Sequence, residues 1–199
     1  MKSQIKRSFK FSISIAVITF VLAAIFSVIS SSMLSDLMWI LGLLIVFLIV
    51  LVGVLFDMLG TASAAADEPP FHAMAAEKVF GAKQAITIVR NAERVASFCN
   101  DVIGDISGIV SGTASAIVVL QLANGFGQSE GSSVHLVISV LLTSLVAALT
   151  VGGKAMGKYF AIHSSTQIIF FAGKIVAFIE EKFKIKILPS EKKKEARKS

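Results

Sequence analysis

Cysteine and charged residues are scarce in this 199-residue chain, and each scarcity excludes a class of protein. The single cysteine, Cys99, excludes an internal disulfide framework and provides no metal-binding motif. Only 16% of the residues are charged, whereas 55% are hydrophobic. The mean hydropathy of +0.80 is rarely reached by a soluble domain, and several apolar runs approach or exceed the roughly 18 residues typical of a spanning helix. The composition therefore predicts an integral membrane protein.

Lysine and arginine are absent from two stretches, residues 31–37 and 122–133. They gather in the N-terminal tail, in the segment 78–94 and after residue 153. If the chain crosses the membrane four times, all of these basic groups lie on one side, and the positive-inside rule makes that side the cytoplasm. The net charge of +6 then reports topology and contact with anionic lipid rather than nucleic acid. We expect a multi-pass protein of the cell membrane, with both termini in the cytoplasm and no nucleic-acid partner.

Hydrophobic runs and turn signals predict an all-α integral membrane fold in three parts. Residues 1–36 form a basic tail and an extra transmembrane helix, because the apolar run is longer than the core of a signal peptide. Residues 37–188 form a three-span domain, and residues 189–199 form a charged tail. Within the domain we expect spans at about 37–59, 98–122 and 134–152, a juxtamembrane helical hairpin at 67–96, and an amphipathic belt helix at 154–187.

The stretch SFCNDVIGDISGIVSGTAS, residues 97–115, is apolar enough to enter a membrane yet carries two carboxylates. On an α-helix Asp101 and Asp105 lie one turn apart on the same side, together with Gly104, Gly108 and Gly112. Charged side chains in a bilayer are costly, so they normally face a protein interior or a wet cavity. We interpret this face as a cation site on an inner helix. A glycine-lined packing seam, with the aspartates near the membrane surface, is the alternative.

Three short motifs follow one another along the chain. RNAERVAS at 90–97 resembles a linker ending in "NPERFLS", the next helix is similar to a "GNxxxN" helix, and GKAMGKYFA at 153–161 resembles "GExxPKxxA". These motifs belong to the transmembrane domain of the CNNM/CorC (CorB) magnesium transport family. The resemblance covers roughly residues 37–185 and does not include the family's CBS domains.

The resemblance implies transport of a divalent cation, Mg²⁺ or Co²⁺, across the cytoplasmic membrane by a homodimer with an acidic intramembrane cavity. The ion is then a substrate, and no cofactor is expected. Mg²⁺ prefers oxygen ligands and keeps several waters, so a few side chains suffice. The expected metal ligands are Asp57, Ser97, Asn100, Asp101 and Asp105.

Lys154 stands where the family has the glutamate of "GExxPK". Its ammonium group would either pair with an aspartate as a counter-charge or extend toward the membrane surface. This departure supports an alternative function, a non-transporting family member that acts as a membrane interaction or regulatory protein. A remote alternative is an intramembrane aspartyl protease in which Asp57 and Asp105 share a proton. Val102 stands where that family has a glycine, and no PAL triplet occurs, so we expect no enzyme.

Overall fold

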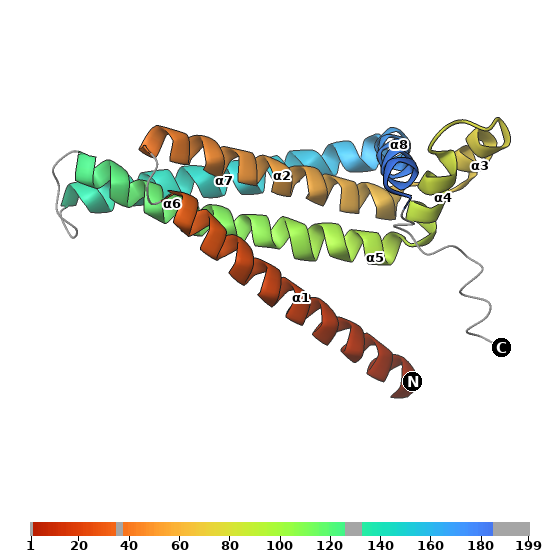
Figure 1. Cartoon of the computed structure of the whole chain (residues 1–199), viewed down its shortest axis with the longest axis horizontal. Coiled ribbons are helices and arrows are strands. Elements are labelled where there is room, and N and C mark those ends of the chain that lie inside the picture. The colour runs from red at the N-terminus through yellow and green to blue at the C-terminus, as the bar shows by residue number, and fades with distance from the viewer. Residues whose placement is uncertain (1, 35–37, 126–132, 185–199) are drawn as a thin grey trace. The chain divides into compact units, whose positions relative to one another are not determined.

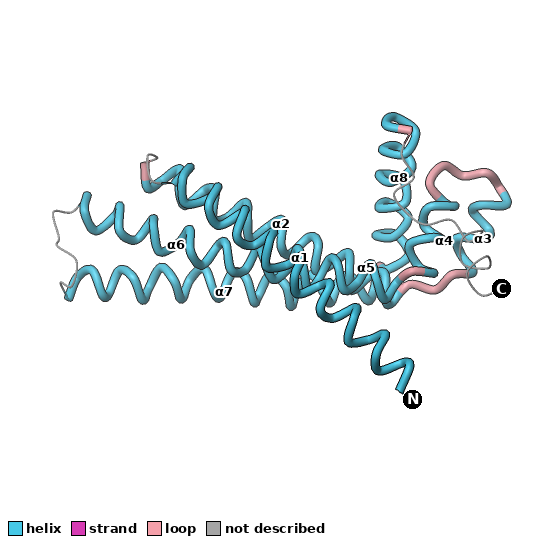
Figure 2. Tube along the Cα trace, turned by 60° about the horizontal axis from the view of Figure 1, so that its bottom comes forward, coloured by secondary structure: helices cyan, strands magenta, loops and turns pink. Residues whose placement is uncertain are grey.

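The computed structural model describes residues 2–34, 38–125 and 133–184, and the elements in these ranges are all helices (Figures 1 and 2). The prediction of an all-α fold is therefore confirmed. The elements are α1 (Lys2–Leu34), α2 (Trp39–Ala65), α3 (Pro69–Ala76), α4 (Ala82–Arg90), α5 (Ala92–Ser97), the π-helical segment η1 (Phe98–Gly104), α6 (Asp105–Gly125), α7 (Ser133–His163) and α8 (Ser165–Phe183).

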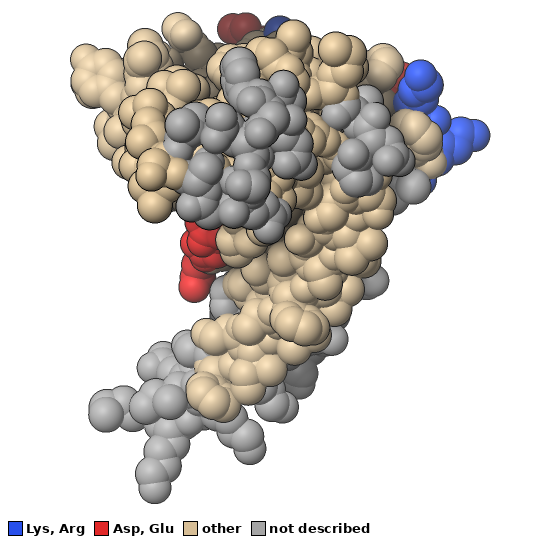
Figure 3. Space-filling model, turned by 90° about the vertical axis from the view of Figure 1, so that its left-hand side faces the viewer, with Lys and Arg blue, Asp and Glu red and all other residues tan. Residues whose placement is uncertain are grey.

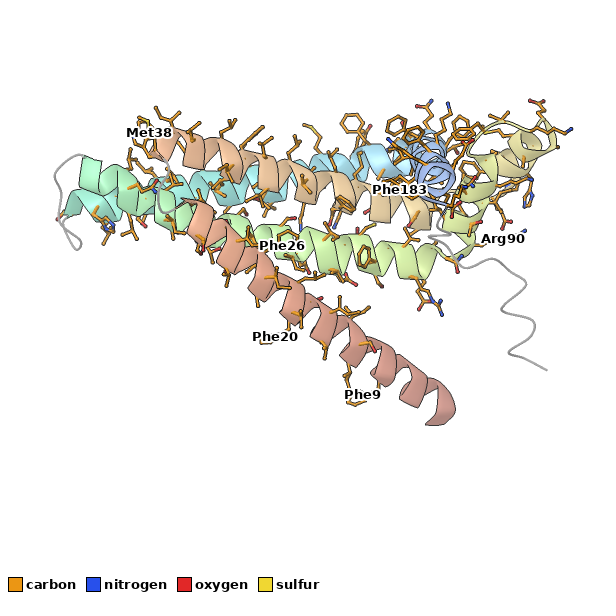
Figure 4. All side chains as sticks on the ribbon, viewed as in Figure 1. Phe9, Phe20, Phe26, Met38, Arg90 and Phe183 are labelled. Carbon is orange, nitrogen blue, oxygen red and sulfur yellow. The ribbon has the colours of Figure 1, made fainter. Side chains whose placement is uncertain are left out.

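Four of the described helical stretches are long and apolar enough to cross a membrane. They are Ser12–Ser32, Trp39–Ala65, Ala92–Leu122 and His135–His163. Most of the described surface that is visible in Figure 3 belongs to residues other than Lys, Arg, Asp and Glu. Large apolar side chains such as Phe20 and Phe26 project from α1 (Figure 4). Exposed apolar side chains along such helices are what a lipid environment requires, which agrees with a multi-pass membrane protein.

The chain divides into two compact units, Met1–Phe56 with Asn100–Met156 and Asp57–Cys99 with Gly157–Ser199. In the first unit, α1 crosses α6 and then diverges from it toward the N-terminus (Figure 1). Its core contains two clusters of buried side chains. The first consists of Leu34, Val46, Ala114 and Val118, and the second of Val102, Ile106 and Val110.

Glycines bring α2 close to α6 in the first unit. A Cβ atom on Gly53 would lie 2.7 Å from the Cβ of Ser107, and one on Gly42 would lie 2.6 Å from a methyl group of Val118. Small residues allow the backbones of membrane helices to approach closely, which is where dispersion contacts and packing contribute most. The amide of Gln121 also donates a hydrogen bond to the carbonyl of Leu34.

The second unit is held together where α4 crosses α8. Gly81 has a left-handed φ of 87° at the start of α4, and a Cβ atom on Gly173 of α8 would lie 2.6 Å from the Gly81 carbonyl oxygen. The buried cluster around this crossing includes Phe71, Ile169 and Ala161. Gln84 Nε2 donates a 3.0 Å hydrogen bond to Glu180 Oε2 beside it.

Helix α8 packs through a different face from the one its apolar pattern suggests. It buries Ile169, Ala172, Gly173 and Ala177, whereas Phe171 and Phe178 are exposed. Gly173 packs against α4, and the described residues leave Phe171 and Phe178 uncovered. Lys174 Nζ lies 4.3 Å from the ring centroid of Phe170, as expected for a lysine whose stem lies along an apolar surface.

Helix α7 is longer than the predicted span at 134–152. It continues through Gly152 and Gly153 to His163, and the chain turns at Ser164 before α8 begins. A Cβ atom on Gly153 would lie 3.0 Å from Val54, so this glycine provides room for α2 rather than ending the helix. The start predicted for the belt helix, residue 154, therefore lies inside α7, and α8 covers Ser165–Phe183. Residues 185–187 of the predicted belt helix and the predicted tail 189–199 lie outside the described residues.

The crossing of α4 and α8 gives a stability prediction. Gly173→Ala should lower the free energy of unfolding by about 1–3 kcal/mol, because the new methyl group meets backbone atoms that cannot move aside. The control is Gly152→Ala, since no atom lies within 4 Å of a Cβ atom at that position. The control should be neutral or slightly stabilising. Thermal unfolding of both variants in detergent measures the difference, and equal midpoints would contradict the crossing.

Candidate carboxylate and lysine site

Two of the predicted metal ligands, Asn100 and Asp101, lie on a π-helical segment. Residues Phe98–Gly104 form η1, in which hydrogen bonds run from residue i to i+5. Asn100 and Asp101 belong to this segment, whereas Asp105 is the first residue of α6. Because a π-helical turn takes about one residue more than an α-helical turn, Asp101 and Asp105 still lie on nearly the same side, and both are exposed. Segments of this kind occur frequently at functional sites.

The face of α6 that is buried differs from the predicted one. Asp101 is exposed, and the side chain of Asp105 is 64% exposed. The buried polar residues are Ser107, Ser111 and Ser115 instead. Ser107 and Ser111 bond to carbonyls of their own helix, at 2.8 and 3.0 Å. The two carboxylates therefore do not line the interior of the described part of the chain, which is lined by small polar and aliphatic side chains of α6 instead.

Lys154 of α7 contacts the junction between η1 and α6. Its Nζ atom donates a 3.1 Å hydrogen bond to the carbonyl oxygen of Gly104 and lies 3.5 Å from Asp105 Oδ1. The lysine side chain is only 20% exposed. An ammonium group thus occupies the space next to Asp105 in which a bound cation was expected. Of the two positions foreseen for Lys154, pairing with an aspartate is the one that the structure has.

Asp57 lies in the second unit and has its own lysine. Its side chain is 5% exposed, and its Oδ2 atom lies 3.6 Å from Nζ of Lys158. Lys158 is one helical turn after Lys154 on α7 and is 52% exposed. The hydroxyl of Thr61 donates a 2.9 Å hydrogen bond to the backbone oxygen of Asp57. The contact of Lys158 with Asp57 was not foreseen from the sequence. The spacing of four residues between Lys154 and Lys158 was the available signal, because it places two lysines on one face of the same helix.

The five predicted ligands are divided between the two units. Asp57 and Ser97 belong to the second unit, and Asn100, Asp101 and Asp105 belong to the first. Within residues 2–34, 38–125 and 133–184, no group of three or more His, Cys, Asp or Glu side chains is placed to hold a metal ion. Asn100 Oδ1 is buried and has no hydrogen-bond partner in this part of the chain.

A second polar cluster joins α3 and α4. Glu68 accepts a hydrogen bond from Arg90 Nε and lies 2.7 Å from His72 Nε2. These hydrogen bonds, His72 first and Arg90 second, lower the pKa of Glu68 below its ordinary value of 4.5. Arg90 lies at the end of α4 (Figure 4). His72 therefore takes part in an exposed ionic contact between helices.

Neither a protein-family model, nor a curated protein, nor a solved structure matches this chain. The chemistry of the site is therefore inferred from its own geometry. In the first unit, that geometry consists of Asp105 beside Lys154, with the exposed Asp101 on the preceding π-helical turn. In the second unit, it consists of Asp57 beside Lys158.

The contact between Asp57 and Lys158 can be tested by a double-mutant cycle. Lys158→Met should destabilise the protein by about 1–2 kcal/mol, because it leaves a buried carboxylate without its ammonium neighbour while half of the lysine side chain is already solvated. Asp57→Asn should remove most of this penalty when the two changes are combined. The measurement is the unfolding midpoint of the parent, both single variants and the double variant. Additive effects would show that the two groups do not interact.

Proposed function

We propose that this chain is a non-transporting membrane interaction protein that associates with a second copy of itself through the exposed face of α6. The observation that carries the proposal is the position of Lys154, whose ammonium group lies 3.5 Å from Asp105 Oδ1 and bonds to the Gly104 carbonyl oxygen. The ammonium group of Lys154 takes the place of a divalent ion and lowers the free-energy cost of keeping the Asp105 carboxylate within a span.

The face of α6 that the described residues leave uncovered suits a helix partner. It carries Gly108 and Gly112, where a Cβ atom would meet nothing within 4 Å, and the exposed Asp101 and Asp105. Glycines spaced by four residues allow close approach of a second membrane helix. Exposed carboxylates on a span need water or protein around them, because hydrocarbon does not solvate them. A second copy of the chain would provide that cover.

The distribution of basic residues supports an orientation for this assembly. Lysine and arginine are excluded from the two segments between successive spans at 31–37 and 122–133. The positive-inside rule then places both termini in the cytoplasm of a cell-membrane protein.

Association through α6 gives the first test. Gly112→Ile should shift the protein from dimer to monomer, because the branched side chain prevents close approach of the partner helix. Gly152→Ile is the control, since it adds the same side chain at an open position of another span. Light scattering after size exclusion in detergent measures the mass. A monomeric parent, or a dimer that Gly112→Ile does not affect, would contradict this face as the interface.

Divalent-cation transport is the second candidate, and one observation favours it. Asn100 Oδ1 is buried without a hydrogen-bond partner in the described chain, and Asp101 follows it directly on η1. Amide and carboxylate oxygens are ligands that Mg²⁺ accepts. The pairing of a half-exposed carboxylate with lysine is also weak, about 0–1 kcal/mol, so a divalent ion could displace Lys154.

A titration with Mg²⁺, Co²⁺ and Ca²⁺ separates the two candidates. We expect no ion to change the unfolding midpoint of the parent, because Lys154 already neutralises Asp105. Lys154→Glu, which restores the residue of the resembled family, should introduce stabilisation by divalent ions, because a second carboxylate then adjoins Asp105. Lys83→Glu is the control, since Lys83 is exposed on α4. Stabilisation of the parent by Mg²⁺ that Asp101→Asn and Asp105→Asn both abolish would favour transport and overturn the proposed function.

A further inference from the structure

An apolar groove of about 390 Å³ runs along the first unit between α1, α2 and α6. Its floor includes the fully or nearly fully buried side chains of Leu34 and Val110. Its rim includes Phe26, Leu48 and Val52, which are 45–50% exposed. All three lining helices contribute candidate membrane spans. The groove is therefore continuous with the surface that these helices present to lipid.

Two of the residues that line the groove are polar, Ser107 and Ser30, and they differ in whether the hydroxyl has a hydrogen-bond partner. The hydroxyl of Ser107 donates a hydrogen bond to the carbonyl of Ile103. Ser30 is 9% exposed, and its Oγ atom is buried without a hydrogen-bond partner in the described part of the chain. A buried hydroxyl without a partner carries a desolvation penalty, which a ligand oxygen that accepts its hydrogen bond would remove.

We propose that this groove binds one acyl chain of a membrane phospholipid, with the ester carbonyl of that chain accepting a hydrogen bond from Ser30 Oγ. Ser30 lies two residues from the end of the span Ser12–Ser32. The end of a span marks the boundary between the hydrocarbon and the polar headgroup region, which is where a phospholipid carries its ester groups. The acyl chain then extends from Ser30 into the apolar part of the groove.

The size of the groove suits part of an acyl chain. The lining residues run from Phe26 to Leu34 on α1 and from Ile45 to Val52 on α2. These runs are about 10–12 Å long at ~1.5 Å per residue. The volume of about 390 Å³ falls within the range of roughly 300–1,000 Å³ usual for pockets that bind small molecules.

The first experiment locates the lipid. The full chain is reconstituted in bilayers of dioleoylphosphatidylcholine containing a small fraction of phosphatidylcholine with a diazirine on one acyl chain, and irradiated. We expect labelling to concentrate on the floor of the groove, at peptides that contain Val110. Val52→Trp should lower this labelling at least tenfold by covering the rim. Leu51→Trp, an exposed neighbour that does not line the groove, should leave it unchanged.

Uniform labelling of all exposed span residues would overturn the proposal, as would floor labelling that Val52→Trp does not alter. Circular dichroism and gel filtration confirm that each variant folds.

The second experiment tests the contact with Ser30 and begins with the unaltered protein. Native mass spectrometry from detergent compares retention of dioleoylphosphatidylcholine with that of its diether analogue, which lacks the ester carbonyls. The parent should retain the ester lipid about fivefold better, the effect expected of one ordinary hydrogen bond. Ser30→Ala should bring the ratio to one, and the control Ser14→Ala should preserve it. Equal retention of both lipids by the parent would overturn the proposed contact.

Discussion

The acidic residues in the apolar helices can remain there only if their charge is neutralised. An isolated charge in hydrocarbon is strongly unfavourable, so Asp57 and Asp105 require a partner or water. Lys158 and Lys154, one turn apart on α7, are the partners, at 3.6 and 3.5 Å. Each contact lies within its own unit. The lysines thus allow acidic residues to remain in spans that otherwise consist of apolar and small side chains.

Small residues explain why the helices pack as they do. Because Gly53 of α2 has no side chain, Ser107 of α6 can pack directly against it. In the same way, the backbone of Gly81 at the start of α4 packs against Gly173 of α8. In a membrane, lipid covers large apolar side chains as well as protein does, so burying them gives little advantage. Close approach of backbones then becomes the main source of favourable contacts. Close backbone approach also occurs at α8, where Gly173 lies against the Gly81 carbonyl while Phe171 stays exposed.

The all-α fold and four spanning helices could be predicted from the sequence, because length and hydropathy alone determine which segments suit a bilayer. The details of the site could not. No signal in the sequence indicated the π-helical segment Phe98–Gly104, and the polar pattern did not show that Asp101 and Asp105 lie on the exposed side of the helix rather than the buried side. Gly152–Gly153 also resembled a helix end, whereas Gly153 provides room for Val54. The pairing of Lys154 with Asp105 was foreseen as one of two possibilities, and choosing between them required coordinates.

The continuity of α7 through its glycine pair has an electrostatic consequence. Lys154 and Lys158 are carried by one unbroken helix on nearly the same side. Each ammonium group contacts a carboxylate of its own unit, Lys154 with Asp105 and Lys158 with Asp57. One helix thus supplies a positive charge to an acidic residue in each unit.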